Sequence, residues 1–177
     1  MEAGQWKEAN RETIALMLKA ADREKEGWLD DKFINNFPCT DLRTIDQLWV
    51  KYSSGRFGFS IQKRIWQNVR VTKPKNHVMI MMALVYGNDT VADAESFEYF
   101  SDRIGWQSLN RTLGDHELIF SKEAPEGHLP VFGFFKPFWR IDAFGKTYAF
   151  IPVLAESGRL FSYFFSRLDA CEDQQVE

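Results

Sequence analysis

The sequence predicts a mainly α-helical protein, a single-domain cupped bundle with a long aromatic-rich loop. Apolar residues follow helical spacing along much of the chain, as Ile45, Leu48, Trp49 and Tyr52 do at i, i+3, i+4 and i+7. A total of 16 Phe, 6 Trp and 5 Tyr make up 15% of the chain and crowd its last third. One helical stripe cannot bury that many rings, which indicates a loop rich in aromatic residues. The 177 residues fit one domain with a proper core.

The helices are expected in the following order. A first helix at 5–21 has a continuous apolar face, and a short one at 29–35 is stopped by Pro38. Thr40 is predicted to N-cap the third helix because its hydroxyl can accept a backbone N–H. Further helices are expected through Ile61, Ile65 and Val69, at about 94–104 and at about 156–171. The apolar run HVMIMMALVYG fits a strand or a buried helical turn, and 123–130 fits an extended loop.

Two glycines mark the reversal between the two central helices. Gly55 and Gly58 bracket Arg56 and Phe57, and glycine takes positive φ without a steric penalty. The chain is therefore expected to turn sharply here, with Phe57, Phe59 and Trp66 close to the corner.

Composition and charge restrict the classes of partner. The formal charge of −3 and the pI near 5.7 give no electrostatic reason to expect nucleic acid. The longest apolar run, 78–86, is far too short to span a membrane, which leaves peripheral association open. The N-terminus carries acidic residues and no apolar segment, so neither a secretory leader nor a transit peptide is expected. A monomer is expected.

No residue pattern indicates catalysis, so the chain is not expected to be an enzyme. It has no His or Cys pairs at metal-ligand spacing, no phosphate-binding glycine loop and no nucleophile elbow. Cys39 and Cys171 are interpreted as two reduced thiols. His128 follows a loop glycine, and it could either bond backbone groups or ligate the metal of a tetrapyrrole; the first interpretation is favoured.

A resemblance covers most of the chain. The string LWVKYSSGRFGFSIQKRIW closely resembles the genomes-uncoupled-four (GUN4) domain, the porphyrin-binding activator of magnesium chelatase in chlorophyll synthesis. Segments 6–13, 37–42, 100–106, 124–130 and 165–171 agree with the same family in order. Two regions depart from it: 71–96 resembles an insertion, and 131–152 takes the place of a variable ligand-covering loop.

The resemblance implies a function and a ligand. It implies non-covalent binding of protoporphyrin IX or its magnesium form, without a catalytic cofactor, and a role as accessory to the large subunit of magnesium chelatase. It also implies the cytoplasm of a cyanobacterium or the plastid stroma as the compartment. Two alternatives stay open: a bilin-binding carrier or sensor, because the departing regions alter the surroundings of the pocket, and a protein-interaction module that uses the aromatic patch.

The expected site combines an apolar wall, a loop and a cation. By resemblance, Val50 and Phe59 form the wall, and Arg167 of the final-helix motif anchors a propionate unless it only pairs with Asp169. A flat macrocycle has two apolar faces, which suits the aromatic loop. The loop residues expected to cover the ligand are Phe132, Phe134, Phe135, Phe138 and Trp139.

Overall fold

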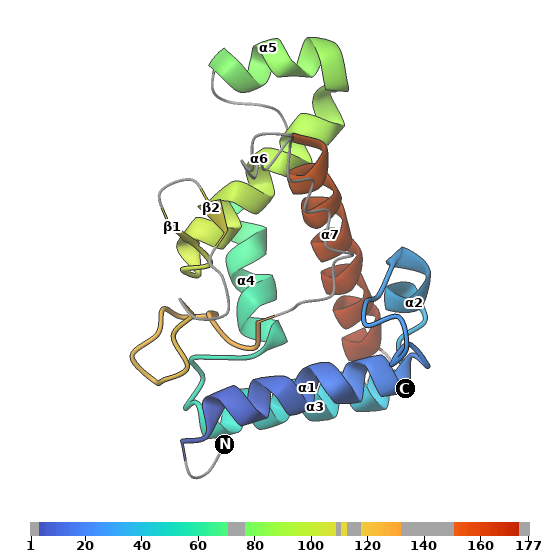
Figure 1. The fold of residues 1–177 in the computed structure, drawn as a ribbon, viewed down its shortest axis with the longest axis vertical. Helices are drawn as coiled ribbons and strands as arrows, with labels where there is room; N and C mark the ends of the chain where they lie inside the picture. Colours follow the sequence, from blue (N-terminus) through green and yellow to red (C-terminus); the bar gives the residue numbers. More distant parts are fainter. Residues whose placement is uncertain (1–3, 71–76, 109–110, 113–117, 132–150, 174–177) are drawn as a thin grey trace.

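The computed structural model describes residues 4–70, 77–108, 111–112, 118–131 and 151–173 (Figure 1). In this part the chain forms seven helices and a two-stranded antiparallel sheet, which confirms the mainly α fold class. The helices are α1 (Trp6–Ala20), α2 (Asp31–Asn35), α3 (Cys39–Tyr52), α4 (Phe59–Val69), α5 (His77–Tyr86), α6 (Asn88–Arg103) and α7 (Ile151–Asp173), and the strands are β1 (Gln107–Ser108) and β2 (Arg111–Thr112).

The helices form two groups set across one another. In Figure 1, α1 and α3 run side by side at the base, and α4, α6 and α7 rise from them. Trp49 ties the base together, since its Nε1 donates to the Thr13 hydroxyl at 2.9 Å and its ring stacks on Trp6 with centroids 5.9 Å apart. In the upright group, Trp66 of α4 meets Phe100 of α6 edge to face at 5.4 Å.

A continuous hydrophobic core joins the two groups. Phe57 lies edge-on to both Trp6 and Trp49, and Phe161 of α7 contacts Trp66 and Phe100. Most of these rings are almost completely buried, so the aromatic content of the last helix is largely core rather than surface.

The predicted glycine reversal is confirmed between α3 and α4. Gly55 has φ +80° and Gly58 has φ +130°. The Ser53 hydroxyl accepts the N–H of Phe57 at 2.8 Å, and Asp46 Oδ1 accepts the N–H of Ser60 at 2.9 Å in the first turn of α4. A Cβ at position 58 would lie 2.8 Å from Asp46 Oδ1, so both the backbone conformation and the close approach require glycine.

Several element predictions were wrong in detail. Thr40 does not cap α3, because the helix begins at Cys39 after Pro38, and the carbonyl of Thr40 accepts the Thr44 hydroxyl inside the helix. The run at 77–87 is neither a strand nor buried: it forms α5, whose outer side is exposed. Helices α6 and α7 both begin earlier than periodicity indicated. None of the helices in the described ranges combines the length and apolar character needed to cross a bilayer.

The two cysteines form a disulfide, so the interpretation as reduced thiols was wrong. The Cα atoms of Cys39 and Cys171 are 5.2 Å apart, and the bond joins the first residue of α3 to the end of α7. Arg43 reinforces the junction, because its Nη1 donates to the carbonyl of Cys171 at 3.2 Å. The cysteines are separated by 132 residues, and only the packing of α7 against α3 brings them together.

Candidate functional site

The two wall residues carried over from the family lie at the glycine reversal. Val50 is half-buried beside Gly58 and keeps part of its side chain at the surface. Phe59 is fully buried, with its ring edge-on to Phe164 of α7 at a centroid distance of 5.0 Å. Val50 therefore reaches the surface, whereas Phe59 packs against α7 inside the core.

Arg167 is held by backbone rather than by an acid. Its Nε and Nη2 both donate to the carbonyl of Phe37, at 2.9 and 2.7 Å, and the residue is half-buried. Asp169, the alternative partner, instead accepts from Lys63 Nζ at 2.9 Å. The Arg167 guanidinium is thus fixed in place by the Phe37 carbonyl.

Lys63 connects α4 to the end of α7. Its ammonium lies 2.9 Å from Asp169 and 2.7 Å from Glu172, with only 11% of the side chain exposed. Burial acts to lower the pKa of Lys63, but the two carboxylates outweigh burial and the pKa is raised. This buried charge keeps the last turns of α7 against the wall.

His128 bonds backbone with both ring nitrogens. Nδ1 lies 2.7 Å from the carbonyl of Ile104, and Nε2 accepts the N–H of Ile119 at 3.1 Å, which fixes the neutral tautomer with the proton on Nδ1. Burial lowers the pKa of His128. The interpretation as a backbone-bonding histidine is confirmed. In the described ranges no group of three metal-ligating side chains occurs.

The predicted covering residues Phe132, Phe134, Phe135, Phe138 and Trp139 lie outside the described residues. The two ends of that segment are placed. The N–H of Val131 donates to Asn10 of α1 at 2.7 Å, and Leu154 near the start of α7 packs against the core. The segment thus joins the base of the molecule to the upright group.

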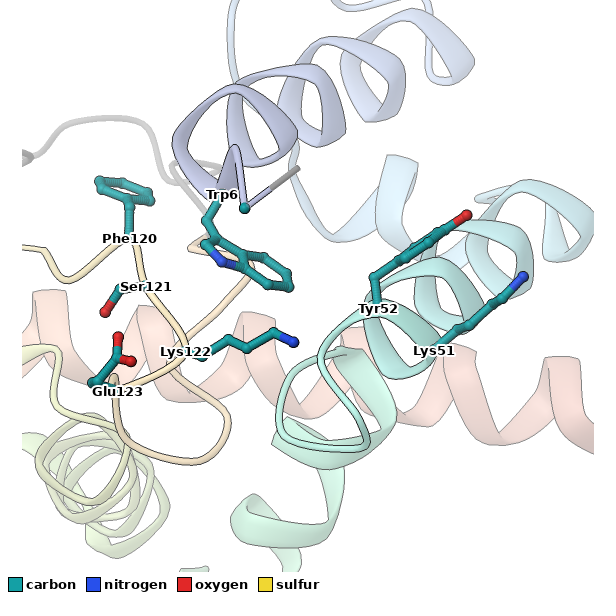
Figure 2. Close-up of a pocket in the computed structure, with 8 residues that line it drawn as sticks. Trp6, Lys51, Tyr52, Phe120, Ser121, Lys122 and Glu123 are labelled. Carbon is teal, nitrogen blue, oxygen red and sulfur yellow. The ribbon is translucent and has the colours of Figure 1, made fainter. Parts of the chain in front are cut away.

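A cavity of about 560 Å³ opens where the start of α1, the end of α3 and the segment at 120–123 meet (Figure 2). Trp6, Tyr52 and Phe120 supply the aromatic rings; Figure 2 shows Lys122 pointing into the space between Trp6 and Tyr52, and Lys51 beside Tyr52. The full lining is Gly4, Trp6, Lys51, Tyr52, Phe120, Ser121, Lys122 and Glu123.

Two lysines and one glutamate supply the charges around this cavity. Neither Lys51 nor Lys122 forms an ion pair with a residue that the structure describes. The Lys51 ammonium lies 5.3 Å from the centroid of the Tyr52 ring. The pKa of Glu123 is lowered, first by a hydrogen bond from the Ser121 hydroxyl, so its carboxylate stays ionised. Sequence reasoning missed this set because its members come from three distant segments that share no motif.

A shallower groove of about 370 Å³ runs between α1 and α3. Its walls are mainly apolar, with Leu16 and Leu48 both more than two-fifths exposed. It contains no cation that could pair with an acidic ligand.

The fold and the first cavity define a class of protein: a small helical domain with a cavity large enough for a ligand and lined by aromatic residues and lysines. The GUN4-like family model matches residues 1–147, and the chain belongs to this family. The resemblance noted from the central motif is thereby confirmed.

Three relatives show the extent of the similarity. The Arabidopsis thaliana "Tetrapyrrole-binding protein, chloroplastic" is 29% identical over 128 residues, 71% of this chain and 43% of its own length. The "Ycf53-like protein" of Synechocystis sp. is 31% identical over 59% of this chain and 35% of its own length. An uncharacterised ycf53 protein of Porphyra purpurea is 30% identical over 66% of this chain and 39% of its own length. The chain thus spans less than half the length of these relatives.

Solved structures agree on the fold. GUN4 from Chlamydomonas reinhardtii superposes with a TM-score of 0.55 at 24% identity, covering 92% of this chain and 83% of that one. Ligand-free GUN4 from Arabidopsis thaliana gives a TM-score of 0.51 at 25% identity, covering 74% of this chain and 78% of that one.

Proposed function

We propose that this chain binds a tetrapyrrole non-covalently and is not itself an enzyme. The observation that carries the proposal is membership of the GUN4-like family over residues 1–147, since one relative in that group is named a tetrapyrrole-binding protein. The ligand is protoporphyrin IX or its magnesium form, with a bilin as the alternative. The proposed contacts are Val50, the aromatic residues of the 132–139 segment and Arg167, with Phe59 supporting the wall.

The physical case rests on apolar contact and paired charge. A macrocycle that buries several hundred Å² of ring at about 25 cal/mol per Å² gains on the order of 10 kcal/mol before the costs of association. Propionates at its rim need cations, and Arg167 is already oriented by its two bonds to Phe37. The cavity of Figure 2 offers a second placement, with aromatic faces and the ammonium groups of Lys51 and Lys122.

Titration with porphyrins and bilins tests the proposal. Protoporphyrin IX, its magnesium form and biliverdin are added separately while tryptophan quenching and the Soret band are recorded. We expect saturable micromolar binding of a porphyrin, weakened in Val50→Asp and Arg167→Ala. Arg167→Lys should keep much of the affinity, because it retains the charge while losing the paired geometry. Absence of quenching with every tetrapyrrole would favour the protein-interaction alternative.

Matched variants assign the site. His128→Ala is the control for Phe59→Ala, since both remove a fully buried ring but only the Phe59 ring packs against Phe164 of α7. A larger affinity loss in folded Phe59→Ala places the ligand on the wall. If only Lys51→Glu and Lys122→Glu lower the affinity, the ligand is assigned to the cavity of Figure 2 instead.

We further propose that the bound porphyrin is presented to the large subunit of magnesium chelatase. Membership of the GUN4-like family supports this role through the sequence resemblance described above, and reconstituted chelatase activity with and without the protein tests it. Stimulation that follows porphyrin affinity across the variants supports presentation. Porphyrin binding without stimulation favours a carrier. The proposed compartment is the cyanobacterial cytoplasm or the plastid stroma, as the origins of the relatives suggest.

A further inference from the structure

The Cys39–Cys171 disulfide lies one helical turn from the arginine proposed to anchor the ligand. Arg167 and Cys171 are at i and i+4 on α7, so their side chains share one face of that helix. Across the junction, Phe37 precedes Cys39 by two residues, and its carbonyl accepts both bonds from Arg167. The disulfide therefore joins the same two chain segments that the Arg167–Phe37 bonds join.

The disulfide limits how far the Arg167–Phe37 contact can move. Both residues lie within one turn of a bridged cysteine, and the bridge holds the start of α3 against the end of α7. The guanidinium is thus oriented before any ligand arrives. A ligand that meets an oriented cation does not have to order a long, flexible side chain, which is one of the main entropic costs of binding.

Other contacts keep the end of α7 in place when the disulfide is open. Lys63 of α4 holds Asp169 and Glu172 through ion pairs at 2.9 and 2.7 Å. Arg43 of α3 donates to the carbonyl of Cys171 at 3.2 Å. Reduction is therefore expected to loosen the junction between α3 and α7 without unfolding the domain.

The surroundings of the two cysteines favour reversible chemistry. Cys39 is half-buried and Cys171 is fully buried, so a reductant reaches the bridge at Cys39. Cys39 is the first residue of α3, where the positive end of the helix stabilises a thiolate, and the acid of that turn, Asp41, is exposed to water. In a compartment whose thiols are kept reduced, as in the proposed cytoplasm or stroma, a disulfide is more often a redox sensor than a structural brace.

We propose that Cys39 and Cys171 form a thiol switch that sets the affinity of the Arg167 anchor for a carboxylate-bearing ligand. The inference rests on the proposed function, because it assigns a regulation to that same site. In the disulfide state the guanidinium is held ready on the Phe37 carbonyl. In the dithiol state the two segments move apart, and binding must order them again. The oxidised protein therefore binds the ligand more tightly than the reduced protein.

The switch takes its electrons from a dithiol reductant. One thiolate of the reductant attacks Cys39 Sγ and forms a mixed disulfide, while Cys171 Sγ leaves as a thiolate and takes up a proton. The second thiol of the reductant loses its proton and attacks the mixed disulfide, which releases Cys39. Two electrons and two protons pass to the cysteines in all, and the reductant ends as an internal disulfide.

Porphyrin titration of the two redox states tests the switch. Protoporphyrin IX is added to the oxidised protein and to protein treated with dithiothreitol, with free thiols counted in both. We expect dithiothreitol to open the bridge without denaturant and to weaken binding about three- to tenfold, the range that ordering one long side chain accounts for. The Cys39→Ser, Cys171→Ser double variant should bind like the reduced protein and not respond to dithiothreitol. Circular dichroism should show the same helix content in both states.

Two variants show whether the effect passes through Arg167. In Arg167→Ala the anchor is absent, so reduction should change the affinity by less than about twofold. Val50→Asp is the matched control. It also weakens binding, but Val50 lies at the glycine reversal beside Gly58, so reduction should still cost this variant about three- to tenfold.

Four results would overturn the switch: equal affinity in the two redox states, a bridge that opens only in denaturant, loss of helix on reduction, or an undiminished redox effect in Arg167→Ala. Each of them leaves the proposed function standing, because the oxidised protein still binds porphyrin. If neither redox state binds any tetrapyrrole, the proposed function itself fails and the switch falls with it.

Discussion

His128 holds three backbone segments together through one buried imidazole. Nδ1–H donates to Ile104, Nε2 accepts from Ile119, and the His128 carbonyl accepts the indole N–H of Trp106 at 2.8 Å. Protonating Nε2 would place a hydrogen against the Ile119 N–H and put a charge in a buried site. The ring is therefore neutral in the folded protein, in accord with its lowered pKa.

This burial predicts an acid-sensitive stability. The unfolded state takes up a proton near pH 6.5 and the folded state only at lower pH, so the contribution is complete above about pH 6.5 and falls as the pH drops. The free energy of unfolding changes through this group by at most about 1.4 kcal/mol per pH unit, and it stops changing once the pH is below the pKa of His128 in the folded protein. Urea unfolding from pH 7.5 to 5 measures it. In His128→Gln this part of the slope should vanish, and an unchanged profile would assign the sensitivity to other groups.

Gly58 predicts a second residue-scale effect. Gly58→Ala must adopt φ +130° and place a methyl against Asp46 Oδ1 and Val50, at a cost of roughly 3 kcal/mol in the free energy of unfolding. Gly55→Ala is the matched control: φ is +80° but nothing lies within 4 Å, so about 1 kcal/mol is expected. Chemical denaturation measures both, and equal losses would show that the close approach at position 58 is unimportant.

At the residue scale, sequence reasoning found the turn but not the partners. The sequence pattern identified Gly55 and Gly58 as the turn, because the ability to adopt positive φ depends on the residue itself. It could not show that Arg167 bonds the Phe37 carbonyl, or that Phe59 lies wholly in the core, since both depend on how α7 packs.

At the scale of elements, the disulfide fastens α3 to α7. Closing a loop between Cys39 and Cys171, 132 residues apart, restricts the unfolded chain and contributes about 2 to 5 kcal/mol. Thermal unfolding with and without reductant measures this contribution. The Cys39→Ser, Cys171→Ser double variant should have the stability of the reduced protein, and adding reductant should not change its thermal unfolding. Equal stability of oxidised and reduced protein would contradict the prediction.

Helices α6 and α7 approach each other closely at Gly158. A Cβ at Gly158 would clash with the backbone oxygen of Asp93, which cannot move without shifting α6. We therefore expect Gly158→Ala to lower the free energy of unfolding by about 1 to 3 kcal/mol, despite the better helix propensity of alanine. Ser166→Ala, exposed on the same helix, is the control and should change stability little. A stabilised Gly158→Ala variant would show that the helices separate easily.

Element extents were predictable where one helix face is apolar and the other polar. This pattern placed α1, α3 and α4 to within a few residues. It failed for α5, whose residues are apolar all round, and for the start of α6, where buried Val91 and Ala94 follow no strong stripe. The family expectation of an insertion at 71–96 stays a prediction, although α6 residues within it belong to the core.

At the scale of the whole molecule, unfolding should be cooperative everywhere except α5. One hydrophobic cluster extends from Trp6 to Cys171, and none of the α5 side chains that the structure describes belongs to it. Hydrogen exchange should show the amides of α3, α4 and α7 protected to nearly the global free energy and those of α5 exchanging much faster. Uniform protection across all helices would contradict this division.

The sequence by itself determined the helical class, the glycine reversal and the family, because periodicity, backbone freedom and motif wording are local properties of the chain. Only the tertiary structure decided that the two cysteines pair and that Trp6, Tyr52 and Phe120 share a cavity. It also decided which backbone groups bond the buried His128 ring. Each of these depends on residues distant in sequence meeting in space. No single segment of the sequence encodes how the helices pack against one another.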